Sequence, residues 1–139
     1  MSEIFDILQP PDWAAPLGYS NGVAAEGRQV FIAGQIGWTA DAKLVSGGLA
    51  AQAEQALRNI VAVLAQAGGE ARHIVRLNWY VTDKAAYVAQ RKEIGAAYRR
   101  IIGKHYPAMT LLVVAGLLEE GALVEIEATA VVPKRQAQS

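Results

Sequence analysis

Two glutamates stand on one face of the last strand that the sequence predicts, residues 123–132. Side chains of a strand point alternately to its two faces. Glu125 and Glu127 belong to one set, and the opposite set is wholly apolar: Val124, Ile126, Ala128, Ala130 and Val132. A carboxylate on a face that meets other protein needs a partner, water or a ligand, because a buried unpaired charge is costly. The two glutamates are therefore candidates for holding water or a ligand.

Few other side chains could take part in acid–base or metal chemistry. The chain has no cysteine, which excludes disulfides, thiolate metal sites and a cysteine nucleophile. His73 opens a predicted strand, and we interpret it as a surface or capping residue. His105 lies in a loop four residues before Met109 and could act as an acid near neutral pH, although a loop histidine is more often plain surface. No histidine–carboxylate spacing indicates a metal site, and we expect none.

The composition limits the classes of protein that this chain can belong to. Its 139 residues fit one domain, 1–139, and the hydrophobic fraction of 53% is that of a globular protein. Lys+Arg and Asp+Glu are 13 each, a balance that argues against nucleic-acid binding. The first ten residues carry two acids and are not a secretory signal, and no run approaches the roughly 20 apolar residues of a membrane span. We expect a cytoplasmic protein that binds neither nucleic acid nor membrane.

Local patterns predict where the elements that position these residues lie. The β-favouring runs 19–25 and 28–36 flank Glu26-Gly27 and predict a hairpin. The spacing of apolar residues over 49–67 is helical, and two glycines stop that helix. A strand over 74–81 is followed by a second helix that Asp83 caps. Two final strands are expected over 109–115 and 123–132, with an irregular arm before them all (1–18) and a frayed tail after them (134–139).

The resulting order, β-β-α-β-α-β-β, predicts an α+β fold of two layers, with both helices on one face of a mixed sheet. The strand 109–115 is apolar on both of its faces, although the helices can cover only one. A bare apolar sheet face is a liability in water. We therefore expect the other face to meet another subunit; the alternative is that the N-terminal arm covers it as a third layer.

Four segments resemble the RidA/YjgF family of reactive-intermediate deaminases. They are Tyr19-Ser20-Asn21-Gly22, Phe31-Ile32-Ala33-Gly34-Gln35-Ile36, Tyr106-Pro107-Ala108-Met109-Thr110 and Val124-Glu125-Ile126-Glu127-Ala128-Thr129-Ala130-Val131. The likeness extends from about residue 16 to 133 with the same order of elements. It implies a chorismate-mutase-like fold, a homotrimer whose sheets form a central barrel, and small-molecule clefts between subunits. It also implies hydrolysis of enamines or imines to ketones and ammonia, with no metal or organic cofactor.

The resemblance assigns roles to particular residues. Tyr19 matches the family's cleft tyrosine, Glu125 the glutamate that positions or activates water, and Gly34 and Gln35 the loop whose backbone lies by the ligand. Thr110 matches the last position of the motif Pro-Ala-Arg-Ser/Thr. Met109, however, stands where the family has the arginine that grips the substrate carboxylate. Gly95 occupies the place of an expected asparagine on the second helix.

The methionine leaves three functions open. Met109 offers no donors to a carboxylate, so a small imino acid should bind badly. The chain is then a deaminase for a more apolar or aromatic substrate, which Met109, Trp38 and Trp79 would favour and which His105 would also contact, or a non-catalytic binding or regulatory trimer with the same clefts. An endoribonuclease or translation inhibitor is the third and weakest possibility. For Trp38 and Trp79 the ordinary alternative is packing, and Trp79 shares a strand face with Leu77 and Val81.

Overall fold

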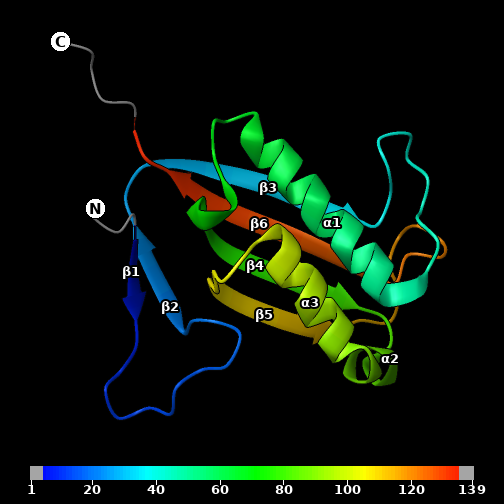
Figure 1. Cartoon of the computed structure of the whole chain (residues 1–139), viewed down its shortest axis with the longest axis horizontal. Coiled ribbons are helices and arrows are strands. Elements are labelled where there is room, and N and C mark those ends of the chain that lie inside the picture. Colours follow the sequence, from blue (N-terminus) through cyan, green and yellow to red (C-terminus); the bar gives the residue numbers. More distant parts are fainter. Residues whose placement is uncertain (1–4, 135–139) are drawn as a thin grey trace.

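A four-stranded mixed sheet forms one layer of the molecule (Figure 1). The computed structural model describes residues 5–134. The strand order is β3-β6-β4-β5; β6 is antiparallel to both of its neighbours, and β4 is parallel to β5. The four strands are β3 (Arg28–Ile36), β4 (Ile74–Val81), β5 (Ala108–Val113) and β6 (Val124–Val132). Motifs far apart in sequence therefore lie on neighbouring strands.

Helices form the second layer and cover one face of this sheet (Figure 1). The longest is α1 (Gly48–Ala65), and the short 3-10 helix η1 (Ala71–His73) leads into β4. The predicted second helix is two helices, α2 (Lys84–Ala89) and α3 (Arg91–Ile101). Asp83 caps α2 as predicted, since its Oδ1 accepts from the Ala86 N–H at 3.0 Å. Gln90 separates the two helices, and its side chain accepts from the Ala50 N–H in the first turn of α1.

The core confirms the alternation expected for the last strand. The five apolar residues of β6, from Val124 to Val132, are buried beneath α1 and α3, whereas the residues between them are only partly buried. Leu57, Ile60 and Leu64 of α1 are fully buried against them. Trp79 also belongs to this core, which confirms the packing interpretation for that tryptophan. The two-layer α+β fold is therefore as expected.

The N-terminal part differs from the prediction. The predicted hairpin is wrong: β2 (Gly22–Ala25) pairs with β1 (Phe5–Leu8), whereas β3 pairs with β6. A two-residue hairpin turn of the favoured type I′ needs positive φ at both positions, and Glu26 does not adopt it. Gly27 has a φ of 150°, and a Cβ there would lie 2.3 Å from the Val132 carbonyl oxygen. The chain thus runs past the end of β6 instead of turning back.

The ends of the chain were expected to be irregular. Strand β1 contradicts this for residues 5–8, which pair in register with β2. Of the predicted frayed tail, only Lys134 lies among the described residues; 135–139 lie outside them.

The face of the sheet opposite the helices is left open. Phe31 of β3 and Leu112 of β5 lie on this open face and are 73% and 50% exposed. The β1–β2 pair forms a separate sheet beside the main one (Figure 1). The N-terminal arm therefore does not cover Phe31 or Leu112, and the third-layer alternative is wrong for these residues.

Candidate functional site

Glu125 and Gly34 meet on the open face of the sheet. The register of β3 against β6 shifts between Ile32 and Gln35, so the chain bulges at residues 33–34. A Cβ on Gly34 would lie 2.1 Å from Glu125 Oε2, so only glycine leaves room for the carboxylate in this position. Gln35 holds the same bulge, because its Nε2 donates to the Ala33 carbonyl at 3.0 Å. Two segments of the family motif are thus in direct contact.

Glu127, two residues further along the same face, is engaged by other side chains. Its Oε1 accepts from the Tyr80 hydroxyl at 2.5 Å and from the Asn78 amide at 3.1 Å. The hydrogen bond to Glu127, with burial as a second cause, raises the pKa of Tyr80, which therefore stays a neutral donor. Within residues 5–134 no side chain donates to the Glu125 carboxylate. Glu125 is the glutamate that remains available to water or a ligand.

A cavity of about 660 Å³ opens on the other side of the sheet, between β5 and α3. Met109 pairs with Leu77 across the parallel strands, which places its side chain on the face that the helices cover. The cavity lining is largely aromatic and aliphatic, and it includes Tyr19, Trp79, Tyr98, Tyr106, Met109 and Leu111. A methionine at this point makes the cavity apolar and adaptable in shape.

Tyr19 is held beside Met109 by the segment that precedes β2. The Ser20 hydroxyl donates to the Tyr106 carbonyl at 2.5 Å, and the Ser20 N–H donates to the Pro107 carbonyl at 3.0 Å. Tyr19 and Met109 also line a second cavity of about 320 Å³, to which Thr110 and Arg76 contribute. The structure therefore brings Tyr19, Met109 and Thr110 together at the edge of the sheet.

The predicted site is consequently divided within one subunit. Tyr19 and Met109 line both cavities and Thr110 lines the smaller one, whereas Glu125, Gly34 and Gln35 line neither of them. Met109 and Glu125 lie on opposite faces of the sheet, because Met109 is in register with Leu77 and Glu125 with Tyr80. One copy of the chain does not bring both groups to one ligand.

Two further predicted residues lie elsewhere. Trp38 follows β3, and Asn59 of α1 donates to its backbone carbonyl at 2.9 Å; it does not line the larger cavity. His105 is partly buried, with Nε2 2.7 Å from the Ile74 carbonyl and its ring edge-on to Phe5. Its ring nitrogen is committed to a backbone contact, and it lines neither cavity.

The other histidine is a buried capping residue. His73 Nδ1 accepts from the Glu70 N–H at 2.9 Å and closes a capping box at η1, so the capping interpretation is confirmed and the surface one is not. Among the residues that the structure describes, no three His, Asp or Glu side chains gather in a way that could hold a metal ion. None of the helices in that part of the chain is long and apolar enough to cross a membrane.

Of the α3 residues that line the larger cavity, sequence reasoning singled out only Gly95, at the place of an expected asparagine. It assigned no role to Arg91, Tyr98 and Arg99. Tyr87, Arg91 and Tyr98 share one flank of the predicted helix, and this amphipathic mixture of aromatic and cationic side chains was the available signal. The strand residues that face this flank across the cavity, Met109 and Leu111, could not be identified from the helix sequence alone.

The described residues form a two-layer α+β domain with a cavity between its last helix, α3, and its edge strand, β5. The family model described as "Endoribonuclease L-PSP" matches residues 11–132. The chain therefore belongs to this family, which is the RidA/YjgF family. The resemblance that the sequence motifs suggested is thereby confirmed.

Individual relatives agree with this assignment. The chain is 32% identical to the human protein named 2-iminobutanoate/2-iminopropanoate deaminase over 114 residues, which are 81% of this chain and 79% of that protein. A Yersinia pestis structure, described as a protein of unknown function of the conserved Rid family, is 36% identical, with a TM-score of 0.79 over 93% of this chain and 99% of that one. The structure of RidA from a Psychrobacter species is 30% identical with a TM-score of 0.66, covering 91% of this chain and 99% of that one.

Proposed function

We propose that this protein is a homotrimeric deaminase that hydrolyses a reactive enamine or imine whose body is more apolar or aromatic than a small imino acid. The observation that carries the proposal is the Glu125 carboxylate, seated over Gly34 and without a protein donor among residues 5–134, whereas Oε1 of the neighbouring Glu127 is bonded to Tyr80 and Asn78. Membership of the family and the name of the human relative support the general reaction class.

Assembly supports the same proposal, because it would complete the divided site. The exposed apolar side chains Phe31 and Leu112 lie on the same open face as Glu125. Covering this face with another copy would remove them from water and bring a second subunit to Glu125. In that arrangement the carboxylate of one subunit meets the cavity of a neighbour.

The proposed reaction needs one water and no cofactor. Glu125 takes a proton from water as the water oxygen bonds to the carbon of the protonated imine, which gives a neutral carbinolamine. Glu125 then returns this proton to the nitrogen, and the carbon–nitrogen bond breaks as the hydroxyl group loses its proton to solvent, which leaves a ketone and ammonia. Met109 and the aromatic side chains around it hold the apolar body of the substrate.

A non-catalytic binding or regulatory trimer is the second candidate, and Met109 favours it because the family's arginine is absent. The ribonuclease activity in the family's description finds little support, since the formal net charge is zero. Ammonia release separates the first two candidates. The substrates are imines generated in situ. They are made from small amino acids, from aromatic amino acids, and from carboxylate-free amines of similar size.

We expect turnover of the bulky substrates and little of the small ones. Glu125→Gln should lower kcat by about 10²–10⁴-fold while the mass in light scattering stays that of a trimer. Glu127→Gln is the matched control on the same face. Release of ammonia at the wild-type rate by Glu125→Gln would eliminate the role of this carboxylate, and no release from any substrate by an intact trimer would favour the binding module.

A further inference from the structure

One arginine of α3 lies over the cavity at the point where a side chain is missing. Gly95 lines the cavity, and a Cβ built there would lie 3.5 Å from Arg99 Nη1. Residues i and i+4 of a helix share a face, and side chains point towards the N-terminus, so Arg99 folds back over Gly95. Glycine is less favourable than alanine inside a helix. Here it leaves space that the guanidinium can enter.

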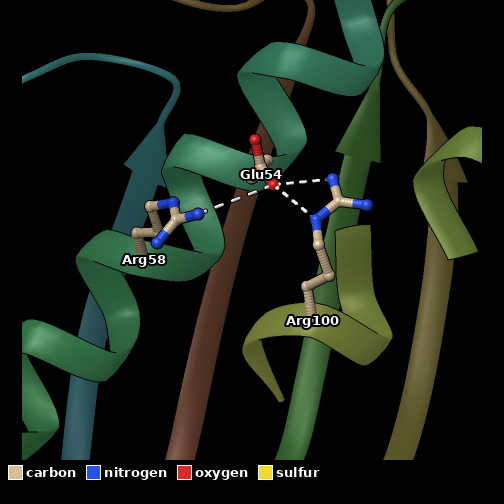
Figure 2. A network of polar contacts seen from close by, with 3 residues as sticks. All are labelled: Glu54, Arg58 and Arg100. Atoms are coloured by element: carbon tan, nitrogen blue, oxygen red, sulfur yellow. Dashed lines mark hydrogen bonds and ion pairs between the residues drawn. The ribbon is translucent and has the colours of Figure 1, made fainter. Parts of the chain in front are cut away.

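Of the other arginines nearby, Arg100 pairs with a protein carboxylate, whereas Arg91 lies over a protein ring. Arg100, the next residue, donates to Glu54 of α1 at 2.7 Å, and Glu54 also pairs with Arg58 at 3.7 Å (Figure 2). Arg91 also lines the cavity, but its guanidinium lies over the Tyr87 ring at 5.9 Å. Arg99 has no carboxylate within 4.0 Å among residues 5–134. Arg91 keeps its N–H donors as well, because a contact with a ring face uses none of them, but Arg99 is the guanidinium that lies next to the space at Gly95.

The rest of the cavity is suited to a ring. Tyr98 stacks on Tyr106 with ring centroids 5.6 Å apart, and Trp79 lies beside Tyr98 at 6.5 Å. Met109 and Leu111 complete the wall on β5. A guanidinium forms two parallel hydrogen bonds with a carboxylate, which neither methionine nor tyrosine can replace. The site therefore combines one anion-binding group with an aromatic wall.

We propose that Arg99 binds the carboxylate of a ring-bearing acid whose aromatic body lies against Tyr98, Tyr106 and Met109. This rests on the proposed function and deepens it: the substrate is an aromatic enamine or imine that carries an acid group, held from α3 instead of from β5. Acids without a ring lack the wall contacts, and ring compounds without an acid group lack the contact with Arg99.

Binding of stable compounds tests this without turnover. The probes are phenylacetate, its neutral analogue phenylacetamide, and acetate, measured by calorimetry on the assembled wild-type protein. We expect phenylacetate to bind at least about tenfold more tightly than either of the other two, as for one hydrogen-bonded charge pair. Equal affinities for phenylacetate and phenylacetamide would overturn the proposal.

Variants identify the residue. Arg99→Gln should weaken phenylacetate about tenfold or more and leave phenylacetamide unchanged. Arg100→Gln, which removes the neighbouring guanidinium on the side facing α1, should leave both affinities unchanged. Gly95→Leu should fill the space beneath Arg99 and weaken both ring compounds while the helix stays folded. Wild-type affinity in Arg99→Gln, or an equal loss in Arg100→Gln or Arg91→Gln, would overturn the assignment.

The test of the Arg99 site can fail or succeed independently of the test of deaminase activity. If phenylacetate binds through Arg99 but no imine is hydrolysed, the deaminase proposal fails and the anion site stands. If aromatic imino acids are hydrolysed with the same KM by wild type and Arg99→Gln, the deaminase proposal stands and the role of Arg99 is refuted.

Discussion

The two faces of the sheet differ in composition and in burial. On the face that the helices cover, the apolar residues of β6, β4 and α1 form one continuous buried cluster. On the open face, the same strands carry Glu125 beside Gly34, and Glu127 bonded to Tyr80 and Asn78, with Phe31 and Leu112 exposed around them. Alternation along β6 separates the two sets residue by residue.

The difference separates the face whose packing folds the chain from the face that we propose for contact with another copy. The covered face is complete within one subunit. The open face combines carboxylates with large apolar groups, and the exposure of those apolar groups to water is unfavourable. The cavity that contains Met109 opens at the edge of the covered face, whereas the Glu125 carboxylate lies on the other face. Variants on each face should therefore fail in different ways.

The largest effect is expected for a charge on the open face. Phe31→Lys would place an ammonium group in the proposed contact between subunits, where desolvation penalises it. Light scattering should show the mass falling about threefold, from trimer to monomer. Val63→Lys is the control, because Val63 is an exposed apolar residue of α1 on the helical side. A trimer that persists in Phe31→Lys would mean that this face is not the interface.

Removing volume from the covered face should act on folding itself. Leu57 is fully buried between α1 and the sheet, so Leu57→Ala leaves a cavity there and should cost about 2–5 kcal/mol of unfolding free energy. Urea denaturation at several protein concentrations measures it and separates it from assembly. A loss below about 1 kcal/mol would mean that the helices repack easily over β6.

Two glycines sharpen the comparison, because a methyl group added to each meets a different neighbour. A Cβ on Gly37 would lie 2.5 Å from the Gln52 Cα, so Gly37→Ala forces backbone apart and should cost about 1–3 kcal/mol. A Cβ on Gly34 meets the end of the Glu125 side chain, which can swing away. Gly34→Ala should keep its stability within about 0.5 kcal/mol while turnover falls. A larger loss of stability in Gly34→Ala than in Gly37→Ala would contradict this comparison.

The smallest effect is a dependence of stability on pH. Burial lowers the pKa of His73 and of His105 below 6.5, so the unfolded chain binds more protons just below that value. Stability is therefore complete above about pH 6.5 and falls as the pH drops towards the lowered pKa values. Protonating His73 Nδ1 also removes its bond from the Glu70 N–H.

Thermal unfolding at pH 7.5 and 5.5 measures this effect. The midpoint should be lower at pH 5.5, and His105→Gln should reduce the difference while its amide can still donate to the Ile74 carbonyl. The same difference between the two midpoints in wild type and variant would show that His105 does not contribute to the pH dependence.

Much of the architecture could be predicted because its signals are local. The spacing of apolar residues over α1, the stop at Gly68-Gly69, the Asp83 cap and the alternation in β6 each depend on neighbours within a few residues. The hairpin failed for the same reason: two β-favouring runs around a glycine do not say whether they pair with each other. Strand β3 found its partner about 100 residues later, in β6.

The features of the candidate site also separate into those that the sequence predicts and those that it does not. By its motifs the sequence alone determined the family, the candidate carboxylate Glu125 and the replacement of an arginine by Met109. Only the tertiary structure decided that Met109 and Glu125 face opposite sides of the sheet, that Glu127 is engaged by Tyr80, and that Arg99 lies over Gly95. Residue identity and periodicity are properties of the chain, whereas register, bulges and the packing of a helix on a strand arise from contacts between distant segments.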